Sequence, residues 1–381
     1  MNRSGTFVNN LSGNLSYRSF KPSDLPPIPQ ISIDEILDKK IKEAYHLLGE
    51  LDGISKSIPN KDLFISMYIR KEALLSSQIE GTQASLDDIF DPNLEINMNL
   101  DVEEVIQYIK AMNHANTLIE TLPISTRFIK EIHKILLTSS RGNEKDPGEL
   151  RKTQNWIGPK GSSLKNAKFI PPNVNDMMDS LSNFERYIHQ DDALDSLVKI
   201  GLIHYQFETI HPFLDGNGRI GRILISILLK HYGLLQEDTL YLSYYLKRNR
   251  VEYYDRLMDV RLKGHYEAWL KFFIEGIIES SKHALKTIDS LLKLKKENLN
   301  RLEKLKGKPK QNALLLFDYI ESHPIIDIKQ ASIGIDKAYN TVSSAVNTFI
   351  KYGILKQVDG NKRYRVFVYE SYLNILRDGT N

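Results

Sequence analysis

Hydrophobic residues recur at helical spacing through most of the chain. Between Ile36 and Gly53 they fall three and four positions apart, which predicts an amphipathic helix. The same spacing, with Gly or Pro at several ends, predicts helices over 61–80, 101–122, 125–140, 174–190, 194–210, 218–231, 249–290 and 281–306. The chain is therefore expected to be mainly α-helical.

Two stretches depart from this pattern. Residues 1–35 contain Pro22, Pro26, Pro27 and Pro29, which oppose helix formation, so they are expected to form an arm. Residues 141–172 are rich in Gly and Pro and predict a short β-hairpin. Its arms are expected at 153–157 and 167–170, around a turn at 158–163.

The pattern changes again after 307–309. Helices are predicted over 311–322, 328–333 and 337–352, followed by strands over 355–358 and 364–369 with a turn at 359–362. That order is typical of a winged helix-turn-helix. Its candidate recognition helix carries Tyr339, Asn340, Thr341, Ser343, Ser344 and Asn347, and its wing carries Lys362, Arg363 and Arg365.

Composition narrows the function classes. The 381 residues include no cysteine, which excludes disulfides, thiolate metal sites and cysteine nucleophiles. A net charge of +3 gives no bulk argument for nucleic acid or membrane binding. Residues 1–17 have no apolar core of a signal peptide, and no run of 18 apolar residues is present. A cytoplasmic protein without membrane partners is expected.

The strongest candidate chemistry lies between His211 and Arg222. Pro212 disfavours helix in the residue before it, so His211 is expected at a helix exit. Gly216-Asn217-Gly218 can form a turn that leads into the next helix, whose N-terminal N–H groups suit an anion.

Charged residues complete this segment. Arg219 and Arg222 share a helix face and favour more than one phosphate. Asp215 would repel phosphate unless Mg²⁺ lies between them, and His211 could take a proton from a hydroxyl. A base, a metal ligand, an anion-binding turn and two arginines predict phosphoryl or nucleotidyl transfer.

The string His211-Pro212-Phe213-Leu214-Asp215-Gly216-Asn217-Gly218-Arg219-Ile220-Gly221-Arg222 resembles the Fic family signature HPFx[D/E]GNGRxxR at every defined position. The resemblance implies a Fic helical core with a small β-hairpin flap, and transfer of AMP from ATP to a Ser, Thr or Tyr hydroxyl of a protein. It implies that His211 is the base, Asp215 the Mg²⁺ ligand, and Phe213 the anchor of the loop. Gly216, Asn217 and Gly218 would form the anion hole, Arg219 would hold the phosphate chain and Arg222 the γ-phosphate, and Ile220 and Gly221 belong to the same ATP-binding segment.

A second segment resembles the family's inhibitory pattern [S/T]xxxE[G/N]. It is Ser76-Ser77-Gln78-Ile79-Glu80-Gly81, and it lies N-terminal to the core, as in the family's second regulatory class. The resemblance implies that Glu80 pairs with Arg222 and leaves no place for the γ-phosphate. The alternative is a solvated Glu near a helix end.

Further features extend the resemblance. Residues 147–158 resemble the start of the flap, which would align a target segment by strand addition, although an ordinary surface hairpin fits as well. The family places adenine near Tyr253 and Tyr254, but tyrosines at this spacing are also typical of a core. His204 and His211 do not have zinc spacing, so His204 is expected to pack in the core.

The expected domains are an N-terminal arm (1–35), an N-terminal helical region with the inhibitory motif (36–122), the Fic core (123–290), a helical linker (291–307) and the winged helix-turn-helix (308–375). Self-modification, UMP transfer and removal of AMP with Glu80 positioning water remain open. Phosphotransfer is disfavoured, because Gly216 and Arg222 are intact. A DNA-binding regulator with a nucleotide-sensing pocket is a further alternative, and the winged helix could instead support protein contacts or a homodimer.

Overall fold

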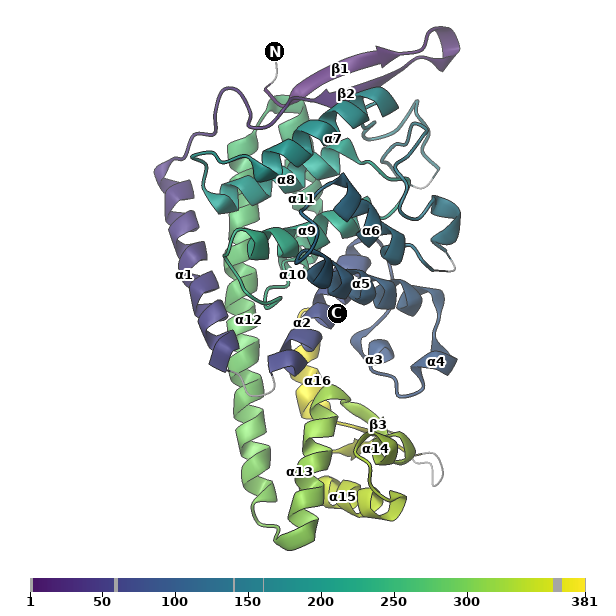
Figure 1. Cartoon of the computed structure of the whole chain (residues 1–381), viewed down its shortest axis with the longest axis vertical. Helices are drawn as coiled ribbons and strands as arrows, with labels where there is room; N and C mark the ends of the chain where they lie inside the picture. Colours follow the sequence, from purple (N-terminus) through teal and green to yellow (C-terminus); the bar gives the residue numbers. More distant parts are fainter. Residues whose placement is uncertain (1–2, 58–60, 140, 160, 359–364, 381) are drawn as a thin grey trace.

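The structure is a computed structural model that describes residues 3–57, 61–139, 141–159, 161–358 and 365–380. Within these ranges the chain is mainly helical, which confirms the expected fold class. The long helix α12 (Tyr266–Leu302) connects a large upper body with a smaller lower part (Figure 1). At about 1.5 Å per residue, its 37 residues span roughly 55 Å.

The upper body is built around α8 (Ser196–Ile210), in which residues 197–210 are all buried. It packs against α7 (Val174–His189), α9 (Asn217–His231) and α12. Gly201 permits the close approach of α12, because a Cβ there would lie 2.8 Å from the side chain of Leu270. Trp269 donates its indole N–H to the carbonyl of Gly201 at 2.9 Å. This packing fixes the end of α8, where the candidate loop begins.

The N-terminal helical region packs directly on α9. α2 (Lys61–Ile79), α5 (Leu100–Leu118) and α6 (Thr126–Leu136) each contact α9. The short helices α3 (Leu86–Ile89) and α4 (Leu94–Asn97) connect α2 with α5, and α10 (Ser243–Arg248) packs on α2. Segments more than a hundred residues apart therefore meet at the start of α9.

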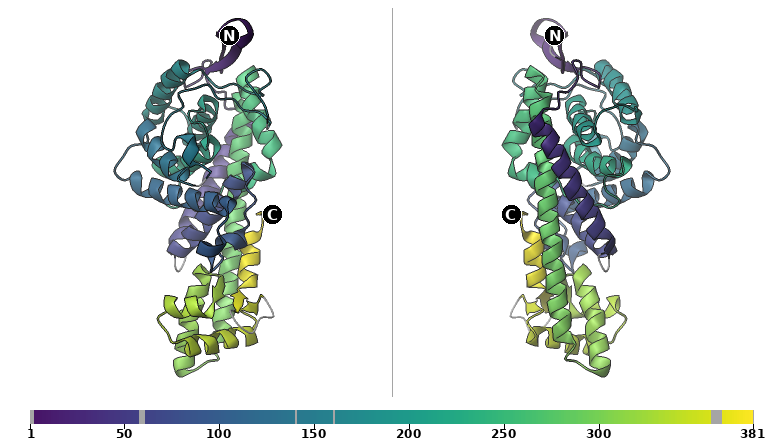
Figure 2. Two further views of the ribbon diagram at one scale, coloured as in Figure 1. Left: turned by 90° about the vertical axis from the view of Figure 1, so that its right-hand side faces the viewer. Right: turned by 90° about the vertical axis from the view of Figure 1, so that its left-hand side faces the viewer.

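α1 (Glu35–Ser57) lies alongside α12, as Figures 1 and 2 both show. It continues past Gly53, where the sequence predicts its end. A glycine inside a helix costs only about 1 kcal/mol relative to Ala. Burial of the face that includes Leu48 and Leu51 can exceed that cost.

The expected N-terminal arm contains a β-hairpin. β1 (Gly5–Asn10) pairs antiparallel with β2 (Tyr17–Pro22), with the 3-10 turn η1 (Gly13–Leu15) between them. The prolines do not prevent this pairing, since Pro22 is the last strand residue and the others follow it. Phe20 donates its backbone N–H to the carbonyl of Ile170 at 3.0 Å, so the hairpin docks on the Gly- and Pro-rich stretch.

In the described part of the predicted flap hairpin, the pairing consists of one antiparallel bridge. Ile157 and Phe169 exchange backbone hydrogen bonds of 2.8 and 3.0 Å, within the two segments expected to pair. The 3-10 turn η2 (Asn143–Lys145) precedes them. Pro171 and Pro172 follow the second segment and lack the N–H groups that would extend the ladder.

The predicted helix over 249–290 is divided in two. α11 (Arg250–Lys263) ends at Gly264, whose φ of 71° is left-handed, and α12 begins at Tyr266. Gly adopts this conformation at little cost, so it ends the helix despite continuous apolar spacing. α12 also absorbs most of the predicted helical linker over 291–307.

The lower part contains α13 (Gly307–Ser322), β3 (Ile325–Asp327), α14 (Ile328–Gly334), α15 (Tyr339–Lys351), β4 (Lys356–Gln357), β5 (Val366–Val368) and α16 (Glu370–Arg377). The strands form an antiparallel sheet in the order β3-β5-β4. β3 and α16 are additions to the predicted elements, and the turn at 359–362 lies outside the described residues. The identity of this part as a winged helix-turn-helix stays a prediction.

The chain after α16 returns to α2. The ammonium of Lys71, which is 2% exposed, donates to the carbonyl of Asp378 at 2.7 Å. Lys247 donates to the carbonyl of Thr380 at 3.1 Å and to Gln78 of α2 at 2.8 Å. Hydrogen bonds thus connect the chain after α16 to α2, the helix that precedes Glu80. Among the described residues, no helix combines the length and apolar character needed to cross a membrane.

Candidate functional site

His211 lies at the exit of α8, as predicted. Its φ of 50° is left-handed, and its N–H still donates to the carbonyl of Phe207 at 3.0 Å. The carbonyl of His211 accepts from Nε of Arg151 at 3.0 Å and from Nδ2 of Asn155 at 3.2 Å. A positive φ in a non-glycine residue is uncommon and is typical of functional sites. Two residues at the start of the flap therefore fix the His211 backbone.

The His211 imidazole is poised as a neutral base. Burial, with a further contribution from the Arg261 charge, lowers the pKa of His211 to about 4. Its Nδ1 is buried, and a hydrogen bond to the backbone of Glu208 only partly offsets the lowering of this pKa. At neutral pH the ring is uncharged, so one nitrogen is able to accept a proton.

Asn217 holds the loop closed with its side chain. Its Oδ1 accepts the N–H of Phe213 and its Nδ2 donates to the carbonyl of Phe213, both at 2.9 Å. Phe213 is fully buried, as expected for an anchor. The side chain of Asn217 therefore braces the loop, and its contribution to an anion hole is limited to its backbone N–H.

His133 is a second brace, which the sequence analysis did not identify. Its ring stacks on Phe213 at 3.7 Å between centroids. Nδ1 accepts from Gly148 N–H at 2.9 Å, which leaves Nε2–H to donate to the carbonyl of Asp215 at 3.1 Å. Burial lowers the pKa of His133 to about 4, and a protonated ring would direct an N–H at the Gly148 donor. His133 lies 78 positions before His211 and carries no local motif.

The first turn of α9 lies where the sequence predicts an anion site. Gly216 is its N-cap residue with a φ of 77°, and no side chain caps the free N–H groups. These groups and the helix dipole favour a negative charge. The carboxylate of Glu80 already lies here, because a Cβ built on Gly218 would be 2.3 Å from its Oε1.

Arg222 is buried and directed toward residues 76–81, the segment that the sequence predicts to be inhibitory. Its Nε donates to Oγ of Ser76 at 2.7 Å, and its Nη2 donates to the carbonyl of Ser76 at 3.1 Å and to Oε1 of Glu80 at 2.5 Å. Burial opposes the charge of Arg222, but Glu80 outweighs this effect and holds the pKa of Arg222 above its ordinary value. Gly81 follows with a φ of 106° and turns the chain away from α2. The two motifs identified in the sequence thus meet at one ion pair.

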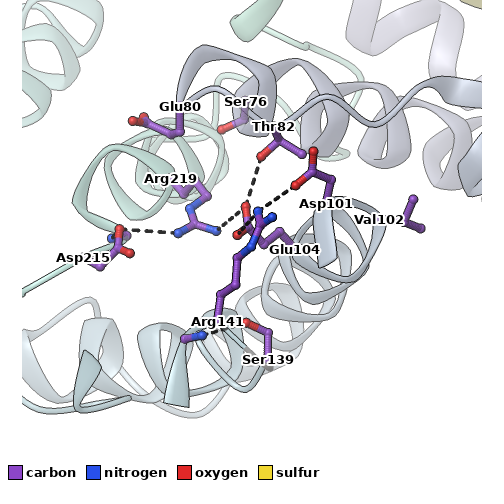
Figure 3. Close-up of polar contacts among 12 residues, drawn as sticks. Ser76, Glu80, Thr82, Asp101, Val102, Glu104, Ser139, Arg141, Asp215 and Arg219 are labelled. Atoms are coloured by element: carbon purple, nitrogen blue, oxygen red, sulfur yellow. Dashed lines mark hydrogen bonds and ion pairs between the residues drawn. The ribbon is translucent and has the colours of Figure 1, made fainter. Parts of the chain in front are cut away.

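Arg219, in the first turn of α9, lies between two carboxylates (Figure 3). Its Nη2 is 3.6 Å from Oδ1 of Asp215, and its Nη1 is 3.8 Å from Oε2 of Glu104. The sequence predicts Asp215 here but not Glu104, which comes from α5 more than a hundred residues earlier and has no local signal.

Asp215 fits the role of a magnesium ligand. Its side chain is 51% exposed beside the N-terminus of α9, and its Oδ1 accepts the N–H of Gly216 at 2.6 Å. Magnesium is commonly held by one or two carboxylates together with substrate phosphates, so a single half-exposed carboxylate suits it. Within the described ranges no group of three or more His, Asp or Glu residues could hold a metal by itself.

The remaining members of the ATP-binding prediction are less exposed. Ile220 is fully buried in α9. Gly221 faces α8, where a Cβ would lie 2.3 Å from Oε1 of Glu208. Burial raises the pKa of Glu208 to about 7, and this buried acid near Arg222 was not among the site residues predicted from the sequence.

The two candidate adenine residues differ. Tyr253 is buried, and its hydroxyl donates to Nε2 of His204 at 2.8 Å, so it packs in the core. His204 also donates from Nδ1 to the carbonyl of Gly221 at 3.2 Å. Tyr254 is partly exposed beside Tyr253, and the Arg250 guanidinium lies 5.8 Å from its ring centroid. Tyr254 is therefore the member that a ligand can reach.

The candidate recognition helix corresponds to α15. Tyr339, Asn340, Ser344 and Asn347 are exposed on it, whereas Lys362 and Arg363 lie outside the described residues. Arg365 lies over the ring of Phe367, with 5.4 Å from Cζ to the ring centroid. DNA binding and dimer formation stay predictions.

Family comparisons cover the parts that form this site. Residues 39–117 match the Fic/DOC family N-terminal model, and residues 123–229 match the Fic/DOC family model. The first match contains Ser76 and Glu80, and the second contains the loop from His211 to Arg222.

Similar proteins carry the same family name. The chain is 32% identical over 136 residues to "Protein adenylyltransferase Fic" of Drosophila grimshawi, covering 34% of this chain and 25% of that protein. The protein of the same name from Drosophila sechellia is 28% identical over 210 residues, covering 52% of this chain and 38% of its own length. The matches thus span well under half the length of these curated relatives.

A solved structure shares the fold. It is a Fic family protein from Desulfovibrio desulfuricans, with a TM-score of 0.57 and 14% identity over 89% of this chain and 97% of that chain. The two family models match in consecutive segments, and the loop at His211 keeps every defined position of the signature. This chain therefore contains a Fic domain of the Fic/DOC family, preceded by that family's N-terminal region.

Proposed function

We propose that this chain is a protein adenylyltransferase that moves AMP from ATP to a Ser, Thr or Tyr hydroxyl of a protein, with itself as one candidate target. The observation that carries the proposal is the loop between α8 and α9. It brings a neutral imidazole, a half-exposed carboxylate, an uncapped helix N-terminus and two arginines together. The names of the Drosophila relatives support the same activity.

The reaction follows from these positions. The first turn of α9 and Arg219 bind the phosphates, and Arg222 binds the γ-phosphate once Glu80 releases it. Asp215 would hold Mg²⁺, which neutralises phosphate charge when bound. His211 accepts the proton of the target hydroxyl as its oxygen bonds to the α-phosphorus. The bond between the α-phosphorus and the bridging oxygen breaks, and pyrophosphate leaves.

Glu80 acts as a brake in this proposal. Its carboxylate occupies the positive end of α9 and engages Arg222, so a triphosphate competes with it for the same donors. An intramolecular carboxylate is always present at the site, whereas ATP must bind from solution. While Glu80 occupies this position, the protein is therefore expected to transfer AMP slowly.

The test uses ATP labelled on either the α- or the γ-phosphate, with the Glu80→Gly variant to remove the brake. Label that reaches protein only from the α-position supports AMP transfer, and label from the γ-position alone means kinase chemistry. Labelled UTP in a parallel reaction tests UMP transfer, and loss of label from purified modified protein tests AMP removal. If no labelled nucleotide modifies any protein, in a lysate or in the purified chain, adenylyl transfer is contradicted.

A further inference from the structure

We propose that Glu104 is a positioning residue of the phosphate site: it holds the Arg219 guanidinium in place for the nucleotide. This inference rests on the proposed function, because it assigns a role in the binding of the same triphosphate. Glu104 lies on α5, outside both motifs that the sequence identifies.

Within the described ranges, Glu104 makes three polar contacts (Figure 3). Its Oε2 accepts from Oγ1 of Thr82 at 3.0 Å and lies 3.8 Å from Nη1 of Arg219. Its Oε1 accepts from Nη1 of Arg141 at 3.4 Å. The Glu104 side chain is 17% exposed, so these contacts are partly shielded from water. Both oxygens are therefore held, and the carboxylate has a defined orientation toward Arg219.

The distances indicate that Glu104 orients Arg219 without using its donors. Separations of 3.6 and 3.8 Å to Asp215 and Glu104 are ion pairs, beyond the length of a good hydrogen bond. Nε of Arg219 is buried and has no partner among the described atoms. Fixing an arginine side chain in one orientation costs rotamer entropy. Here that cost is met before the ligand arrives, while the N–H groups remain available to phosphate oxygens.

A neighbouring positive charge explains how the Glu104 carboxylate can lie close to a site for an anion. The Arg141 guanidinium pairs with Oε1 of Glu104, the carboxylate oxygen that does not face Arg219, and also with Asp101 at 2.6 Å. This cation offsets the repulsion between Glu104 and an incoming phosphate. Asp215 is the more exposed of the two carboxylates beside Arg219 and is the one suited to a metal ion. Glu104 is therefore the partner that Arg219 keeps when a nucleotide binds.

The turn at residues 80–82 is connected to both Arg222 and Arg219. Glu80 contacts Arg222 directly, and Thr82, two residues later, contacts Arg219 through Glu104. The N–H of Thr82 donates to the carbonyl of Ser77 at 3.2 Å, which fixes this turn on α2. A movement of the turn that withdraws Glu80 would therefore also alter the support of Arg219.

The test measures nucleotide binding by calorimetry in the Glu80→Gly background, with ATP and Mg²⁺ and, separately, with adenosine. Glu104→Gln keeps the size of the side chain and removes its charge. We expect ATP to bind about 3- to 10-fold more weakly, as for the loss of one partly shielded ion pair. Adenosine has no phosphates, so its affinity should not change. Glu104→Asp should recover part of the ATP affinity.

Two further variants show whether the effect passes through Arg219. In an Arg219→Ala background, Glu104→Gln should have no additional effect on ATP binding. Thr82→Val, which removes the hydroxyl donor to Glu104, should weaken ATP binding in the same direction by a smaller factor. It also tests the proposal if Glu104→Gln does not fold. Glu120→Gln, an exposed carboxylate just past α5, is the matched control and should leave both affinities unchanged.

Unchanged or tighter ATP binding by Glu104→Gln would overturn the proposal, and so would an equal loss of ATP and adenosine affinity. Failure of the proposed function gives a different result. In that case ATP binding would still respond to Glu104, but no label would be transferred from the α-phosphate to a protein.

Discussion

The carboxylate of Glu80 lies 2.5 Å from Nη2 of Arg222, although the two residues are 142 positions apart in the chain. They meet at the first turn of α9, next to Gly218. Arg222 is 2% exposed on its side chain and Glu80 is 37% exposed, so the acid is the partner that can leave toward solvent. The ion pair is therefore suited to open by movement of Glu80 while Arg222 stays in place.

Replacing Glu80 with Gly is expected to raise AMP transfer. A hydrogen bond to a charged group contributes about 1.5–3 kcal/mol, which corresponds to roughly 10- to 100-fold in rate if ATP must displace the carboxylate. Incorporation of label from α-labelled ATP into the purified protein measures this. Glu120→Gly, an exposed Glu just past a different helix, serves as control and should behave like the wild type. Equal labelling by Glu80→Gly and wild type would contradict the brake.

The pH dependence of the Glu80→Gly variant should report the lowered pKa of His211. A base works when deprotonated, so the rate should fall on the acid side near pH 4 to 5, since the pKa is about 4 rather than 6.5. Initial rates measured with saturating Mg²⁺ would locate this limb. His211→Ala should reduce the rate by about 10²- to 10⁴-fold at pH 7. An acid limb at pH 6.5 would show that the base is not the buried imidazole.

Metal dependence should centre on Asp215. Chelation of divalent ions is expected to abolish transfer, and excess Mg²⁺ should restore it. Asp215→Asn removes a charged ligand, so it should need about tenfold more Mg²⁺ for half-maximal rate. Titration of Mg²⁺ at fixed ATP checks this expectation. An Asp215→Asn enzyme with the same Mg²⁺ requirement as its parent would exclude Asp215 as a ligand.

Acid should destabilise the fold through His133. Its folded pKa is lowered to about 4, whereas an unfolded His titrates near 6.5, so the unfolded chain binds more protons between these values. The contribution of His133 to the free energy of unfolding is therefore fully present above pH 6.5. It is lost as the pH falls toward 4, and the loss is about 3 kcal/mol. Urea unfolding at pH 7.5 and 4.5 measures the change.

His133→Gln provides the comparison for this acid effect, because an amide can replace both hydrogen bonds without titrating in this range. It should be less stable than the wild type at pH 7.5 and should lose less stability on acidification. An identical pH dependence in the two proteins would mean that His133 is not the responsible group.

Removing residues 378–381 should destabilise the protein through Lys71. The buried ammonium would lose its acceptor, the carbonyl of Asp378, at a cost of about 1–3 kcal/mol in the free energy of unfolding. Lys71→Met should restore part of this loss in the shortened chain, because it removes the unpaired charge. Urea denaturation of the four proteins in this cycle gives the coupling. If the effects of the truncation and of Lys71→Met on the free energy of unfolding are additive, the truncation does not act through Lys71.

Local spacing alone was enough to predict much of this protein. Apolar periodicity predicts most of the helices, and the residues from His211 to Arg222 predict a helix exit, an anion-binding turn and a helix start. These features depend on neighbouring residues, so they can be read from a continuous stretch of sequence. The pairing of Glu80 with Arg222 was expected from a family resemblance, not from the spacing of the two residues.

Only the tertiary structure decided what surrounds the loop. It placed Glu104 beside Arg219, His133 beneath Phe213, and the Asp378 carbonyl on Lys71. It also committed the Asn217 side chain to the loop, paired residues 5–22 as a hairpin and reduced the flap to one bridge. Each of these outcomes depends on which surfaces of distant helices pack together and which buried polar groups must find partners. Apolar periodicity indicates which face of a helix is buried, but it does not indicate which residue of another segment packs against that face.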